Sequence, residues 1–140
     1  MDVLWLQHSM DLDFIKLSLL KILHGNQYLY NSALDEGGVV FLLKSNNVYF
    51  HNEFFFQNFA VSGGSLLISS SERIFISKKS EFNSSFAKQS GGALYIADSE
   101  VQILDVTFFN NSVVLSSHIF SDSSSGMHRT RTLYTYNYKD

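Results

Sequence analysis

The sequence predicts an all-β protein, a right-handed parallel β-helix solenoid of about four rungs, where a rung is one circuit of the chain around the solenoid axis. Two observations carry this prediction. A phrase that opens on alanine and ends on Gly-Gly occurs three times, and its alanines, Ala33, Ala60 and Ala87, are evenly spaced along the chain. Each Gly-Gly is then followed by a short apolar run. A fixed period of this length indicates supersecondary units that stack on one another.

Glycine pairs mark one predicted corner of each rung. They are Gly37 with Gly38, Gly63 with Gly64, and Gly91 with Gly92. Glycine reaches positive φ without steric cost, so a glycine pair suits a sharp corner. The first interval between pairs is slightly shorter than the alanine period and the second is slightly longer, which places single-residue insertions and deletions in corners rather than in strands.

An aromatic column runs through the repeats at nearly the same period as the alanines. Its members are Tyr28, Phe55, Phe82 and Phe108. Stacked strands lie about 4.8 Å apart, so equivalent side chains of neighbouring rungs meet like with like. Two further apolar columns are predicted: Val48, Ile74 and Val101, and Leu23, Phe50, Ile76 and Ile103.

A polar residue lies shortly after each aromatic position in the sequence. These residues are Asn31, Asn58, Ser85 and Asn111, and a small apolar residue (Ala33, Ala60, Ala87, Val113) comes shortly after each of them. Asparagine tolerates the left-handed backbone region and can hydrogen-bond the backbone of its own turn. We therefore expect a second corner at this position.

The first rung is less regular than the others. Met10-Asp11 stands where later rungs have Gly-Gly, and the apolar run Phe14 to Leu17 follows it. The same region also supports an amphipathic helix, because Leu12, Ile15, Leu19, Leu20 and Leu23 recur at helical spacing. Residues 11–27 are therefore a rung or a capping helix, and the rung is favoured because the downstream columns extend back through them.

The chain is long enough for one domain, and its pattern divides it into three parts. Residues 1–10 are an N-terminal segment, 11–113 carry the repeats, and 114–140 form an irregular Ser-rich tail. Residues 121–126 read as a flexible linker. Residues 129–138 alternate in the manner of a terminal strand, which would cap the solenoid or form its edge. Arg129 and Arg131 alone give little support for nucleic-acid binding.

Composition limits the function. The net charge of −3 favours no general attraction to nucleic acid. The absence of cysteine excludes disulfides and thiolate metal sites. No run is long and apolar enough for a transmembrane helix, and the start Met1-Asp2-Val3 lacks the basic region of a signal peptide. Localisation is therefore left undetermined.

Candidate catalytic and metal-binding groups are few. Carboxylates in register beside a basic residue would indicate catalysis, but the acidic residues do not recur in this way and suit solvated corners and outer faces. They are Asp35, Glu36, Glu53, Glu81, Asp98, Glu100 and Asp105. His24 and His51 are separated by one repeat, but their column continues to Ser77 or Lys78 and then Leu104, which supplies no third metal ligand. We predict no catalytic residue, no metal and no cofactor.

The sequons at Asn83 and Asn110 overlap the repeat and would be glycosylated only in a secretory compartment.

The repeat resembles that of polymorphic outer-membrane proteins. The pattern Phe-x-x-Asn-x-Ala appears at Phe55 to Ala60, and a fuller copy runs from Phe82 to Ala87 and on through Gly91-Gly92-Ala93-Leu94-Tyr95-Ile96, with Ser85 in place of the asparagine. Similar repeats occur in ciliate surface proteins and in other pectin-lyase-like β-helices. The resemblance implies a secreted or surface-displayed adhesin-like protein. The short repeat region and the missing signal peptide instead suggest a fragment, or a member used inside the cell.

These patterns predict a non-catalytic structural or protein-interaction module. Parallel stacking leaves strand edges at both ends, and neither end carries a strong polar cap, so we expect other protein chains to pack on the solenoid ends. The alternatives are a structural subunit of a large intracellular assembly, and a carbohydrate-active β-helix enzyme, for which the acidic groove is missing. The sequence leaves the question of a small-molecule ligand undetermined.

Overall fold

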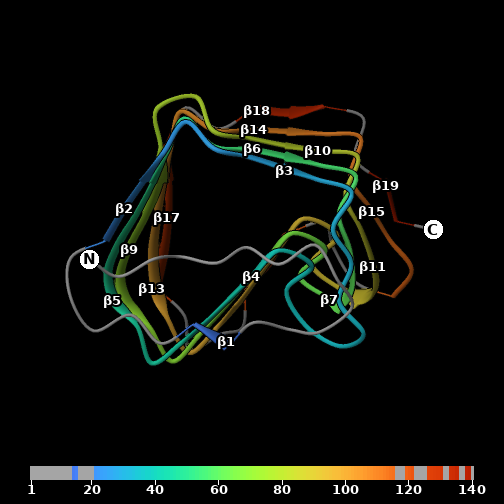
Figure 1. The fold of residues 1–140 in the computed structure, drawn as a ribbon, viewed down its shortest axis with the longest axis horizontal. Coiled ribbons are helices and arrows are strands. Elements are labelled where there is room, and N and C mark those ends of the chain that lie inside the picture. Colours follow the sequence, from blue (N-terminus) through green and yellow to red (C-terminus); the bar gives the residue numbers. More distant parts are fainter. Residues whose placement is uncertain are drawn as a thin grey trace.

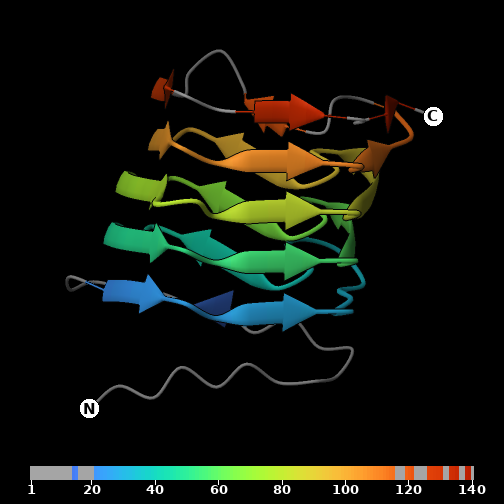
Figure 2. The ribbon, with the colours of Figure 1, turned by 90° about the horizontal axis from the view of Figure 1, so that it is seen from above.

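The computed structural model describes residues 14–15, 21–115, 119–121, 126–130, 133–135 and 138–139, and every element within them is a β-strand. The predicted N-terminal segment, residues 1–10, lies outside these ranges. Within the predicted capping helix over 12–23, the described residues belong to strands, which favours the rung. Figures 1 and 2 show the strands wound into a parallel solenoid, which confirms the predicted fold class.

Each rung contributes its strands in a fixed order. The first has β1 (Phe14–Ile15), β2 (Lys21–His24) and β3 (Gln27–Leu29). The second has β4 (Val40–Leu43), β5 (Asn46–His51), β6 (Phe54–Phe56) and β7 (Phe59–Ser62). The third has β8 (Leu66–Ser69), β9 (Glu72–Ser77), β10 (Glu81–Asn83) and β11 (Phe86–Ser90). The fourth has β12 (Leu94–Ala97), β13 (Glu100–Leu104), β14 (Thr107–Phe109) and β15 (Ser112–Val113).

The strands stack into four parallel sheets, which Figure 1 shows around the solenoid axis. Sheet A has the order β1-β4-β8-β12-β16, sheet B β2-β5-β9-β13-β17, sheet C β3-β6-β10-β14-β18 and sheet D β7-β11-β15-β19. The second, third and fourth rungs therefore have a strand in every sheet. In the first rung, single bridges from Ser32 to Phe59 and from Glu36 to Ser62 take the place of a strand in sheet D.

Parallel pairing does not stop at residue 113, where the sequence analysis ended the repeats. The tail supplies β16 (Ile119–Ser121), β17 (Gly126–Thr130), β18 (Leu133–Thr135) and β19 (Tyr138–Lys139). They pair with β12, β13, β14 and β15 respectively, so a fifth rung continues all four sheets. The single strand predicted over 129–138 is therefore wrong, because each short segment follows the strand beneath it.

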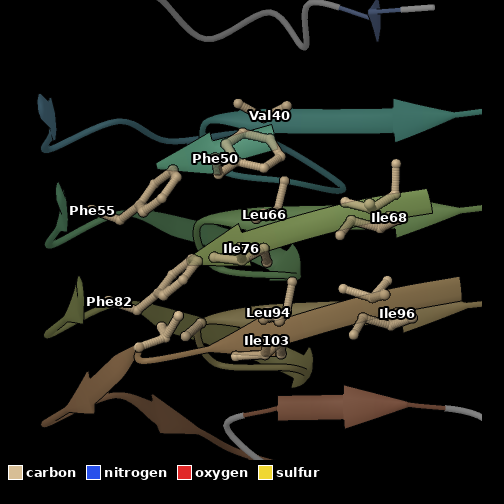
Figure 3. Close-up of a cluster of buried hydrophobic side chains, with 14 of the residues drawn as sticks. Val40, Phe50, Phe55, Leu66, Ile68, Ile76, Phe82, Leu94, Ile96 and Ile103 are labelled. Atoms are coloured by element: carbon tan, nitrogen blue, oxygen red, sulfur yellow. The ribbon is translucent and has the colours of Figure 1, made fainter. Parts of the chain in front are cut away.

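The solenoid interior is a column of apolar side chains. Tyr28, Phe55, Phe82 and Phe108 lie in register on sheet C and are buried. Their rings stack with centroids 4.6, 4.5 and 4.9 Å apart. Figure 3 shows the same stacking of equivalent side chains for Leu66 with Leu94 and for Ile68 with Ile96. Offset or parallel ring pairs of this kind add about 0.5–1.5 kcal/mol each beyond the burial of apolar area.

Removing one ring from this column should be costly. We expect Phe82→Ala to lower the free energy of unfolding by about 3–5 kcal/mol, because the cavity would lie between two stacked rings. Urea denaturation measures this cost. Phe86→Ala is the matched control, since Phe86 lies on the outer face of the neighbouring sheet D and is only half-buried. Equal costs for the two variants, or a Phe82→Ala cost below about 1 kcal/mol, would contradict the inward column.

Candidate functional site

The two glycines of each pair serve different purposes at the corner between sheets D and A. Gly37, Gly63 and Gly91 have φ between 59° and 63°, as the sequence analysis expected. The second glycines are not at positive φ, which corrects that analysis. A Cβ on Gly64 would instead collide with the backbone carbonyl of Gly92 in the next rung, and one on Gly38 with that of Gly64. The second position is therefore glycine because neighbouring rungs approach each other there.

The asparagine column does not take the left-handed conformation that was predicted for it. That conformation belongs to the residue before each member: Tyr30, Gln57, Ser84 and Asn110 have φ of 50° to 56°. Asn58 and Asn111 are buried instead. Each donates its amide to a backbone carbonyl of the preceding rung, Asn58 to Tyr28 at 3.1 Å and Asn111 to Phe82 at 2.8 Å. The asparagines therefore join rungs instead of closing their own turn.

Side chains at this corner also cap backbone N–H groups of the rung before them. The Asn31 N–H donates to Asn58 Oδ1, and the Ser85 N–H donates to Asn111 Oδ1, both at 2.9 Å. Ser85 is the member that replaces asparagine, and its hydroxyl lies 2.7 Å from that of Ser65. Ser65 in turn accepts from the Asn58 amide at 3.2 Å. The replacement of asparagine by Ser85 is thus compensated by the hydrogen bonds among Ser85, Ser65 and Asn58.

Sequence reasoning missed a serine ladder at the corner between sheets A and B. The Ser45 N–H donates to the Ser71 hydroxyl at 3.1 Å, and the Ser71 N–H donates to the Ser99 hydroxyl at 2.9 Å. All three serines are buried. The signal was available, because these serines recur once in each repeat. A buried N–H must find a partner, and here the next rung supplies it.

One carboxylate takes part in the corner between sheets B and C. Glu53 is buried, and its carboxylate accepts from the Asn26 side-chain amide at 3.1 Å. Its own N–H donates to the Ser80 hydroxyl at 3.1 Å. The nearby Tyr28 hydroxyl is buried and makes no hydrogen bond, and burial together with the Glu53 carboxylate raises the pKa of Tyr28. The Glu53 carboxylate therefore binds the Asn26 amide of the first rung at this corner. The Tyr28 hydroxyl stays neutral at physiological pH.

The acidic residues do not gather into a site. Glu81 lies on the partly exposed side of β10, in register with Phe54, whereas Glu53 lies at a buried corner. Asp35, Glu36, Asp98 and Glu100 lie at corners and outer positions, and Asp105 lies at a corner with positive φ. Within the described ranges, no group of three or more His, Asp or Glu residues could hold a metal ion. Among the residues that the structure describes, these carboxylates lie at separate corners and outer positions.

The two histidines are in register on adjacent rungs of sheet B. His24 pairs with His51, and the column continues to Ser77 and then to Leu104. His51 contacts the Tyr49 ring edge-on, with centroids 5.7 Å apart. Burial lowers the pKa of His51, and the positive charges of Lys78 and His24 lower it further.

Aromatic residues also stack on the outside of the solenoid, which the sequence analysis did not predict. Tyr49 and Phe75 stack on sheet B at 4.6 Å, and Phe59 and Phe86 stack on sheet D at 5.5 Å. Lys88 lies 5.4 Å from the Phe59 ring centroid. Their recurrence at the repeat period carried the signal, but the sequence analysis followed only the column from Tyr28 to Phe108. These stacks stabilise the sheets from their outer faces.

Comparisons with protein-family models, curated proteins and solved structures find no match. In the described part of the chain, the structure holds no helix with the length and hydropathy needed to cross a membrane. The fold and its residues therefore carry the functional argument alone.

A methyl group at the close approach between rungs should disrupt the stack. Overpacking typically costs roughly 1–3 kcal/mol. We expect Gly64→Ala to lower the free energy of unfolding by at least about 3 kcal/mol, because backbone atoms cannot move aside as side chains do. Gly25→Ala is the control. Its Cβ would meet only the Asn52 side chain, at 4.0 Å, so only its left-handed φ, about 1–2 kcal/mol, opposes it. Denaturation of both variants tests this, and a smaller loss for Gly64→Ala than for Gly25→Ala would contradict it.

Stability should fall in mild acid. Because the folded protein binds the His51 proton less readily than the unfolded chain, the free energy of unfolding decreases as pH falls through the ordinary histidine value of 6.5. Urea titrations at several pH values between 8 and 5 measure the slope. His51→Gln should flatten it, and Lys78→Gln should reduce it partly. An unchanged slope in His51→Gln would contradict this assignment.

Proposed function

We propose that this protein is a non-catalytic structural and protein-interaction module that contacts other protein chains along strand edges at the ends of its solenoid. The observation that carries the proposal is the topology. Every sheet is an open parallel stack, and in the described part of the chain no further strand pairs with the outer edges of β2 and β3. Edge strands present unpaired N–H and C=O groups, to which another chain can add a strand.

The direction of the free backbone groups on β3 follows from its pairing with β6. The Tyr30 N–H donates to the Phe56 carbonyl, and the Asn26 carbonyl accepts from the Phe54 N–H. Successive residues of a strand direct their peptide groups to opposite sides, so those of Gln27 and Leu29 face away from β6. A partner strand would pair with these two residues.

Exposed apolar side chains gather on the same rung. Ile22, Tyr30 and Leu34 are 60%, 63% and 72% exposed, whereas equivalent positions in the inner rungs are more covered or polar. Tyr30 also takes a left-handed φ of 56°, which is unusual for a bulky residue. Tyrosine is a frequent anchor of protein interfaces. These side chains would add apolar contact to the hydrogen bonds of a partner strand.

More specifically, we propose that the module belongs to a surface-displayed, adhesin-like protein. It rests on the resemblance of the repeat to polymorphic outer-membrane proteins. The same edge contacts would serve a structural subunit of an intracellular assembly, and fractionation of the source cells separates the two settings. A carbohydrate-active enzyme is less favoured, because the described carboxylates are dispersed over corners and outer faces.

An edge-blocking proline tests the proposal. Leu29→Pro removes an N–H that faces away from β6, and proline is tolerated on an edge strand in that position. Leu29→Ala removes the side chain but keeps the N–H, and so serves as the matched control. Tagged versions of both variants and of the unaltered chain are recovered from source cells after cross-linking, with circular dichroism as the check on folding.

The expected result is that protein partners cross-link to the unaltered chain and to Leu29→Ala, and that Leu29→Pro loses them. An identical set of cross-linked proteins for all three chains would contradict the proposed edge contact.

A further inference from the structure

We infer that Asn83 is a modification site: it carries an N-linked oligosaccharide whose first sugar packs on the outward ring of Phe56 in the neighbouring rung. The inference rests on the surface-displayed form of the proposed function, because this modification belongs to the secretory pathway. It deepens that function by naming the chemical group that covers part of the outer face of sheet C. The surroundings of the Asn83 amide carry the argument.

Asn83 is the last residue of β10 and directs its side chain outward. Phe82 before it is buried in the solenoid interior, and successive side chains of a strand point to opposite faces. Asn83 therefore lies on the outer face of sheet C, where it is half-buried. Ser85 completes the acceptor sequence Asn-x-Ser. Asn83 and Asn110 are the two asparagines of the chain that stand in such a sequence.

A series of hydrogen bonds fixes the direction of the Asn83 amide. Its Nδ2 donates to Glu81 Oε1 at 2.9 Å, and its Oδ1 accepts from the Ser84 hydroxyl at 2.8 Å. Ser84 Oγ in turn accepts from Asn110 Nδ2 at 3.0 Å. An amide nitrogen has two hydrogens, and among the described residues Asn83 uses one of them. A sugar would replace the other, so its attachment leaves these hydrogen bonds in place.

Aromatic side chains lie beside Asn83 on both neighbouring strands. The register places it next to Phe56 of β6 and Phe109 of β14, and Figure 1 shows these strands side by side. Strands of one sheet are about 4.8 Å apart, so a sugar on Nδ2 can reach the Phe56 ring and cover apolar surface there. Contacts with Phe54 and Tyr30, at centroid distances of 5.8 and 5.5 Å, hold that ring in place.

Asn110 has different surroundings. It lies at the corner between sheets C and D, with a left-handed φ of 52°. The equivalent residues of the two rungs before it, Gln57 and Ser84, are polar, so a sugar on that side would meet no aromatic ring in register. The inference is therefore made for Asn83 alone.

The transfer of the oligosaccharide has to precede folding of the third rung. The donor is a lipid-linked oligosaccharyl pyrophosphate. The bond from its first sugar to the pyrophosphate breaks, a bond from that sugar to Asn83 Nδ2 forms, the pyrophosphate leaves on the lipid, and one Nδ2 proton passes to a base of the transferring enzyme. That enzyme also recognises the Ser85 hydroxyl, which in the folded chain is buried 2.7 Å from the hydroxyl of Ser65.

The oligosaccharide and the proposed edge contact occupy different places. β6 lies between β10 and the edge strand β3, so a partner strand on β3 is separated from Asn83 by one strand of sheet C. The two proposals can therefore be tested independently.

Mass spectrometry of the protein from its source cells tests the modification. Trypsin cleaves after Lys79 and Lys88, so Asn83 lies in a peptide, residues 80–88, that does not contain Asn110. Peptide N-glycosidase in heavy-oxygen water converts a glycosylated asparagine to an aspartate that carries the label, and we expect this label at Asn83. Asn83→Gln, expressed in the same cells, should lose the oligosaccharide from this peptide. Asn110→Gln is the matched control and should keep it.

Thermal melts test the contact with Phe56. Asn83→Gln removes the oligosaccharide and should lower the melting temperature, because the Phe56 ring becomes more exposed. In a Phe56→Leu background, which lacks the flat ring, Asn83→Gln should cause at most half of this loss. Phe54→Leu is the matched control background: Phe54 lies in register with Glu81, so the full loss should remain. Circular dichroism confirms that each variant folds.

An unlabelled Asn83 would overturn the inference, and fractionation of the same cells assigns the failure. Protein recovered at the cell surface with an unmodified Asn83 refutes the modification and leaves surface display standing. Protein recovered in the cytosol with an unmodified Asn83 refutes both. Equal losses of melting temperature in the Phe54→Leu and Phe56→Leu backgrounds would overturn the contact between the sugar and the Phe56 ring.

Discussion

The structure depends on the close approach of neighbouring rungs at their corners. A rung of four short strands can pair along its whole length with the next rung only if each corner returns the chain directly above the one before it. At Gly38 and Gly64, backbone meets backbone with no room for a Cβ. Glycine at these positions permits the approach at one corner, so that the parallel hydrogen bonds of the four sheets can continue from rung to rung.

The other corners are held by polar side chains that reach from one rung to another. Asn58, Asn111, Ser71 and Ser99 each accept a hydrogen bond from a buried or partly buried backbone N–H of the preceding rung. Buried peptide groups left without partners would each cost about 1–3 kcal/mol, so these contacts remove a penalty at every rung. The apolar columns then supply the favourable term, since each inward ring or branched side chain packs against its own equivalent. The result is a solenoid in which each rung is stabilised mainly by its two neighbours.

Much of this arrangement could be predicted from the sequence, because a constant period places equivalent residues in register. The spacing predicted the Tyr28 to Phe108 column and the strand class, and it favoured a rung over a capping helix for the segment that contains Phe14 and Ile15. Corner conformations were harder to predict. Tyr30, Gln57, Ser84 and Asn110 share a left-handed φ but no side-chain property, so the position is set by chain geometry and not by residue type. The fifth rung was missed because its Ser-rich sequence lacks Gly-Gly and gains its order from pairing with the fourth.

The central claim is that corner amides are held by side chains of the neighbouring rung, and residue-resolved amide hydrogen exchange tests it most directly. The account predicts that the N–H groups of Asn31, Ser45, Ser71 and Ser85 exchange as slowly as those of the adjacent strands, and together with them as one cooperative unit. Exchange of these four amides at the rate of open loops, with protection confined to the strands, would contradict it.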